Sequence, residues 1–190
     1  MPEKKTITFV TKNKEKKSDI KKMLGDKFDI QFTSDLDLTE IQSLSVEEVV
    51  AFKVKQAYEI VGTTVAVSDS GLEIESLKNF PGALVKFVNE TIGQEGITKL
   101  LENVENRNAQ FVAAIGYCDH ERNPIIFVER DKGTISIEPR GDGWHFDRIF
   151  IPKGEKRTWA EIGRERKNID SAFRRALEKM SHWLVEKNLE

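Results

Sequence analysis

The most informative stretch of this chain is Val65-Ala66-Val67-Ser68-Asp69-Ser70-Gly71-Leu72. Its β-branched start predicts a buried strand, and Gly71 permits the sharp turn that we expect to end that strand. Asp69 and Ser70 would then lie at the edge of a sheet, where α/β proteins collect ligands. A carboxylate at such an edge can hold a hard cation, and a hydroxyl with free backbone N–H groups can meet a phosphate. Taken alone, the same residues more often form a turn without chemistry.

Hydrophobic periodicity predicts strands and helices along the rest of the chain. Strands are expected at residues 6–10, 28–32, 65–68, 110–118, 124–129 and 133–137. Helices are expected at residues 14–24, 46–61, 88–104 and 173–184, with glycines breaking the first part of the third. Ser45 and Glu48 form a capping-box signature before the second helix, and Gly62 can end it. The pattern predicts the α/β class, with two lobes of mixed β-sheet flanked by helices around a central cleft.

The composition limits the class of protein. The 190 residues fit a single domain, 1–190, and they are 38% hydrophobic and 33% charged, as in a globular protein with a charged surface. The 30 Lys and Arg nearly balance the 32 Asp and Glu, so no overall field draws the chain to nucleic acid or to a membrane. Cys118 is the only cysteine, which excludes an internal disulfide and a cysteine-based zinc site. Since no signal-like or 18-residue apolar run is present, we expect a cytoplasmic protein.

Phosphate-binding candidates lie between the first strand and the first helix, in Thr11-Lys12-Asn13-Lys14-Glu15-Lys16. A helix start offers unpaired N–H groups and a favourable dipole, and the lysines add positive charge. A solvated helix face is the alternative interpretation of such a lysine run. Lys53, Lys86 and Lys167 stand in partly apolar settings, which makes them further candidates, although their stems can also cover apolar surface while the charge stays in water.

Two acidic residues are candidates for a metal site. Glu40 lies in an irregular segment, residues 37–42, before the second helix, and Asp69 follows the strand described above. Mg²⁺ prefers few protein carboxylates and leaves room for water and phosphate oxygens, so these two side chains could share one ion. The alternative for Glu40 is an exposed acid in a loop.

The segment Trp144-His145-Phe146-Asp147 combines aromatic rings, a histidine and an acid among turn glycines. An aromatic ring can stack on a nucleobase, and Asp147 or nearby backbone groups can bind the edge of the base. A core Trp and Phe beneath a tight turn is an equally good interpretation of the same residues.

Taken together, these residues resemble the inosine triphosphate pyrophosphatase family over essentially the whole chain. The resemblance is carried by Phe9–Lys16, Glu40–Gln42, Lys53, Ser68–Leu72, Phe80–Gly82, Pro139–Gly141, Phe150–Pro152, Ala160-Glu161 and Lys167-Asn168. It implies two α/β lobes around a deep cleft, assembled as a homodimer. It also implies Mg²⁺-dependent hydrolysis of non-standard purine nucleoside triphosphates to a nucleoside monophosphate and pyrophosphate.

The resemblance also implies roles for the candidate residues. Residues 11–16, with Lys53 and Lys86, would cradle the phosphates. Glu40 and Asp69 would hold Mg²⁺, and Asp69 would orient or deprotonate the attacking water. The nucleotide would further be contacted by Ser70, and its base would be surrounded by residues 144–147 and Lys167.

The chain departs from the family pattern where the base is bound. Ala172-Phe173 stands where the family carries His-Arg, and Gly143–Arg148 replaces Gly-Phe-Gly-Tyr-Asp-Pro. Arg174, Arg175, His145 or Arg148 are candidates to supply the missing donors. We therefore expect an altered or relaxed base preference. The alternatives are a catalytically impaired nucleotide-binding homologue and a pyrophosphatase for a different modified nucleotide.

Overall fold

The computed structural model describes residues 4–34 and 36–187. Its strands are β1 (Thr6–Val10), β2 (Asp29–Thr33), β3 (Val65–Ile74), β4 (Pro81–Gly82), β5 (Asn108–Cys118), β6 (Ile125–Ile135) and β7 (Phe150–Pro152). Its α-helices are α1 (Lys14–Leu24), α2 (Val46–Val61), α3 (Val85–Glu90), α4 (Gly93–Leu100), α5 (Trp159–Ile162), α6 (Arg164–Ile169) and α7 (Ala172–Lys187). Two short 3₁₀ turns are η1 (Glu75–Leu77) and η2 (His145–Arg148).

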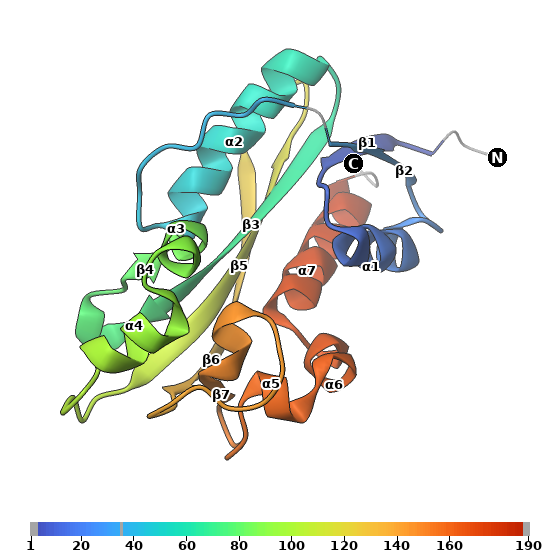
Figure 1. Ribbon diagram of the computed structural model, residues 1–190. Helices are drawn as coiled ribbons and strands as arrows, with labels where there is room; N and C mark the ends of the chain where they lie inside the picture. The colour runs from blue at the N-terminus through green and yellow to red at the C-terminus, as the bar shows by residue number, and fades with distance from the viewer. Residues whose placement is uncertain (1–3, 35, 188–190) are drawn as a thin grey trace.

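A single mixed sheet connects these elements in the order β2-β1-β3-β5-β6-β7, with β4 paired to β3. β1 pairs in parallel with β2 and β3, and the other pairs are antiparallel. Figure 1 shows the long strands β3 and β5 running from the end covered by α2 to the end surrounded by α3, α4, α5 and α6. The predicted α/β class, a mixed sheet flanked by helices, is confirmed.

Three apolar clusters hold the layers together. Helices α1 and α7 pack on one face of the sheet, where Leu24 and Leu177 are fully buried beside Tyr117. Helix α2 packs on the opposite face through Val50 and Val54. A third cluster fills the far end of the sheet, where α4, α5 and η2 contact β5 and β7. Within the described residues, no helix has both the length and the apolarity needed to cross a membrane.

The prediction that β3 ends near Gly71 is wrong, because the strand continues to Ile74. Its pairing with β5 is unbroken there, with Asp69 opposite Ala114. Gly71 serves a close approach instead of a turn. A Cβ at this position would lie 2.5 Å from the carbonyl oxygen of Gly82 in β4 and 2.6 Å from Cγ2 of Val46.

The two strands predicted at residues 124–129 and 133–137 form one strand, β6, which ends at Ile135. The charged residues between them suggested a break, but two of them have partners on the helices that pack on the sheet. Arg130 pairs with Glu47 of α2, and Asp131 pairs with Arg175 of α7. The helix predicted at residues 88–104 is likewise two helices, because the chain breaks after Glu90 and Gly93, the first residue of α4, adopts a positive φ of 63°.

Candidate active site

The candidate residues of β3 lie where β1 stops. β1 ends at Val10, which pairs with Val67, so Ser68, Asp69 and Ser70 stand just beyond its carboxyl end on a strand that continues. The loop after β1 leads directly into α1, whose first turn therefore faces the same edge. Ligands of α/β proteins collect at such an edge. Asp69 and Ser70 therefore lie at the predicted place in the sheet, although β3 does not turn there.

Glu40 and Asp69 meet at the ammonium group of Lys53, which α2 presents to both. Lys53 Nζ donates to Oε1 of Glu40 at 2.8 Å and to Oδ2 of Asp69 at 3.2 Å. Burial alone would lower the pKa of Lys53, but Asp69 and Glu40 outweigh it and raise this pKa above its usual value. The structure thus brings the two predicted metal ligands together around one cation.

Lys16 of α1 is a second lysine close to Asp69. Its Nζ donates to Oγ of Ser68 at 3.2 Å and lies 5.2 Å from the centre of the Phe173 ring. Enclosure by the protein lowers the pKa of Lys16, the charge of Asp69 opposes this shift, and the charge of Lys53 adds to it. Lys16 and Lys53 thus place two amino groups near Asp69, as phosphate binding requires.

The start of α1 is already capped from within the chain. The Asn13 side chain accepts from the backbone N–H groups of Glu15 and Lys16 at 2.9 and 3.1 Å. A phosphate can take those two donors only by displacing the Asn13 carboxamide. Lysine side chains are therefore the readier phosphate ligands at this end of the site.

A cavity of about 490 Å³, in the range of small-molecule sites, opens beside these residues. The predicted residues that line it are Asn13, Glu15, Lys16, Ser70, Lys86, Trp144, His145, Phe146, Asp147 and Lys167. Among the described residues, its lining does not include Thr11, Lys12, Lys14, Glu40, Lys53 or Asp69. Asp69 directly precedes Ser70 of this lining, so the acid–lysine cluster of Glu40, Lys53 and Asp69 lies next to the cavity. The exposed Lys12 and Lys14 lie outside the lining.

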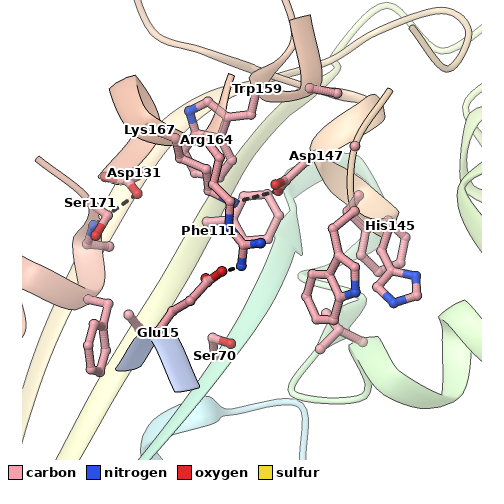
Figure 2. A pocket seen from close by; sticks show the side chains of 18 of the residues that line it. Glu15, Ser70, Phe111, Asp131, His145, Asp147, Trp159, Arg164, Lys167 and Ser171 are labelled. Carbon is pink, nitrogen blue, oxygen red and sulfur yellow. Dashed lines mark hydrogen bonds and ion pairs between the residues drawn. The ribbon is translucent and has the colours of Figure 1, made fainter. Parts of the chain in front are cut away.

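The other end of the cavity is aromatic. Lys167 Nζ contacts Oδ1 of Asp147 at 2.6 Å and lies 4.4 Å from the Trp159 ring and 5.6 Å from the Phe111 ring. Figure 2 shows Lys167 and Asp147 joined in front of these rings. Trp159 and Phe111 were missed by the sequence reasoning. The sequence signal for the position of Trp159 is the capping box of Thr158 and Glu161, because it places Trp159 as the first residue of α5.

The aromatic residues predicted to stack on a base are divided between core and surface. Phe146 is 3% exposed and packs in the third apolar cluster, as the alternative interpretation had it. Trp144 is 72% exposed and contacts His145 edge-on, with ring centres 4.2 Å apart. Trp144 is therefore the better placed of the two to cover a base.

The arginines considered as replacements for the family His-Arg pair are held by acids. Arg174 donates to Oδ1 of Asp19 at 2.5 Å. Arg175 donates to Oδ1 of Asp131 at 2.8 Å and to Oε2 of Glu129 at 3.3 Å. Neither guanidinium is free to bind a base, so this expectation is not supported by the geometry.

Comparison with known proteins places this site in a family. The sequence matches the Ham1 family over residues 7–183. It is 43% identical to a dITP/XTP pyrophosphatase of Methanopyrus kandleri, covering 93% of this chain and 95% of that protein. It is 37% identical to an inosine triphosphate pyrophosphatase of Emericella nidulans, with 96% of this chain and 98% of that protein covered. The Ham1 protein of Staphylococcus aureus has the same fold, with a TM-score of 0.83, 28% identity and coverage of 96% and 100%. The chain therefore belongs to the Ham1 family, the family of inosine triphosphate pyrophosphatases that its motifs resemble.

Proposed function

We propose that this chain hydrolyses nucleoside triphosphates between the α- and β-phosphates, releasing a nucleoside monophosphate and pyrophosphate. The observation that carries the proposal is the acid–lysine cluster, which stands beside a cavity with lysines at one end and aromatic rings at the other. Membership of the Ham1 family and the pyrophosphatase names of its relatives support it.

Glu40 and Asp69 would hold a magnesium ion. Two carboxylates match what Mg²⁺ takes from a protein when water and phosphate supply its other ligands. Among the described residues, no group of three or more His, Cys, Asp or Glu offers a fuller set. When bound, the ion neutralises charge on the phosphates.

The other steps belong to side chains of this chain. Asp69 would orient the attacking water and accept its proton, since it is the acid held on the rigid strand β3. Lys16, Lys53 and Lys86 would bind the phosphates and stabilise the charge that develops on them. Ser70, Trp144, Asp147 and Lys167 would contact the rest of the nucleotide.

We propose a non-standard purine as the base, because the relatives are named for deoxyinosine, inosine and xanthosine triphosphates. Ala172 and Phe173 favour an altered or relaxed preference, since neither side chain donates to a base oxygen. The two alternatives remain a nucleotide binder without turnover and a pyrophosphatase for another modified nucleotide. Homodimer assembly belongs to the same proposal and rests on the resemblance, and the proposed cytoplasmic location rests on the sequence pattern described above.

Pyrophosphate release from a panel of purine and pyrimidine triphosphates, with and without Mg²⁺, tests the function. We expect turnover of inosine triphosphate that needs Mg²⁺ and that falls at least about 100-fold in Asp69→Asn, as for loss of a general base. Asp26→Asn, in an exposed turn, is the control and should keep full activity. Retained activity in Asp69→Asn would remove this residue from its role. Binding of nucleotides without any turnover would instead favour the impaired homologue.

A further inference from the structure

We propose that Arg164 recognises an oxo group on the base of the nucleotide, and that Glu15 holds this guanidinium in the pocket until the base replaces it. The inference rests on the proposed pyrophosphatase function and names the residue that selects its substrate. It assigns a donor that the motif comparison left missing, and it places this donor on α6 instead of α7.

The ion pair between Arg164 and Glu15 bridges the cavity. Arg164 is the first residue of α6, Glu15 lies in the first turn of α1, and both line the pocket. The pair joins positions 149 residues apart in the sequence. Figure 2 shows the Arg164 side chain reaching toward Glu15 in front of Phe111, with Ser70 below.

Arg164 is the cation of the described pocket lining that is best placed to change partners. Lys167 is bound to Asp147 and covered by two rings, and Lys16 is enclosed next to Ser68. Lys86 on α3 is assigned to the phosphates above. By contrast, the Arg164 side chain is 65% exposed and its partner Glu15 is 47% exposed. Exposed ion pairs contribute little free energy, so a ligand can replace Glu15 at low cost.

The position of Arg164 directs it to the base rather than to the phosphates. It lies three residues before Lys167, so both side chains leave α6 on the same face, and Lys167 contacts the rings of Trp159 and Phe111. Glu40, Lys53 and Asp69 do not line the pocket that Arg164 lines. The Arg164 side chain therefore leaves α6 beside the aromatic rings and reaches from there toward Glu15 at the start of α1.

The chemistry of the guanidinium fits an oxopurine. Its planar fork can donate to an oxygen at position 6 and to N7 together, which is the common way in which arginine recognises guanine. Adenine presents an amino group at position 6, and two donors cannot pair there. An arginine at this position would thus favour inosine and xanthosine nucleotides over adenosine nucleotides.

Equilibrium binding tests the inference without turnover. The probes are the α,β-methylene analogues of inosine and adenosine triphosphate and inorganic pyrophosphate, measured by calorimetry. Arg164→Met should weaken binding of the inosine analogue about 10-fold, the discrimination expected of one arginine–base pair, and change the other two affinities less than about twofold. Arg164→Lys, which keeps the charge without the fork, should restore only part of the loss.

Two further variants make the test specific. Arg166→Met is the matched control, because Arg166 is on the same helix, is equally exposed at 65% and pairs with Glu155 outside the pocket lining. It should change no affinity. Glu15→Gln should strengthen binding of the inosine analogue in the wild-type background and have no such effect in Arg164→Met, since the competing carboxylate acts only through Arg164.

The outcomes separate this inference from the proposed function. Equal losses for all three probes in Arg164→Met would make Arg164 a phosphate ligand and overturn base recognition. No loss for any probe would make the pair with Glu15 a purely structural contact. Pyrophosphate release measured on the same wild-type protein decides the proposed function independently, because the binding experiment requires no hydrolysis.

Discussion

Stability and function compete at Lys16. Enclosure by the protein lowers the pKa of its ammonium, Asp69 opposes that shift, and Lys53 adds to it. Such a lysine carries a cost that is complete below its folded-state pKa and is relieved as the pH rises through this pKa toward 10.5. Lys16→Met should therefore raise the free energy of unfolding by about 1 kcal/mol at pH 7 and by less at pH 10, while weakening phosphate binding. Urea unfolding at the two pH values measures the effect.

Lys27→Met provides the comparison, because Lys27 is exposed after the end of α1. Its effect on unfolding should be small and similar at both pH values. A loss of stability in Lys16→Met at pH 7 would show that the contacts to Ser68 and Phe173 outweigh the cost of enclosing the charge.

At the scale of elements, β3 can continue past the site as one long strand paired with β4 because residue 71 is a glycine. A Cβ there would meet the backbone of Gly82 at 2.5 Å, and backbone cannot move aside as a side-chain end can. Gly71→Ala should lower the free energy of unfolding by about 2–3 kcal/mol, as for overpacking, and should disturb Asp69 and Ser70 next to it. Denaturant unfolding together with pyrophosphate release measures both effects.

Gly154→Ala separates lack of space from backbone strain. A Cβ at Gly154 meets nothing within 4 Å, but its φ is 87°, so the substitution should cost only about 1 kcal/mol and leave activity unchanged. Equal costs at the two glycines would mean that β4 can move away from β3.

The elements that could be predicted from the sequence are those whose signal is local. Helix α2 begins after Ser45 and ends before Gly62 in its left-handed conformation, as its capping residues indicated. The sequence pattern ends β3 too early and divides β6 in two, because polar residues in the middle of both strands have partners far along the chain. Asp131, for example, accepts from the backbone N–H of Ala172 as well as from Arg175. Hydrophobic periodicity reports only neighbouring residues, so it cannot predict such long-range pairs.

The same contrast applies to the site. The acids and lysines could be located by motif, because phosphate and metal chemistry restricts the residue types. Arg164 could not, since an exposed Arg is an ordinary surface residue until the fold places it across the pocket from Glu15, a residue that the motif did include. Phe111 is similar, because a β-strand phenylalanine is expected in the core whether or not it also faces a ligand.

At the scale of the whole molecule, the site should couple binding of Mg²⁺ to binding of nucleotide. Glu40 and Asp69 are the two proposed carboxylate ligands, and both already contact Lys53, so neither alone makes a strong metal site. Phosphate oxygens would complete the coordination and also draw on the lysine charge. Each ligand should therefore strengthen the binding of the other by the same factor.

Thermal unfolding measures this coupling, because a ligand that binds only the folded state stabilises it by an amount set by its concentration and affinity. We expect Mg²⁺ alone to change the melting temperature by less than about 1 °C, and the α,β-methylene inosine analogue to raise it. The two together should raise it by several degrees more than the sum. Glu40→Gln should abolish this excess and keep the effect of the analogue alone. Equal shifts with Mg²⁺ alone and with both ligands would contradict the shared site, since the ion would then be held without help from phosphate.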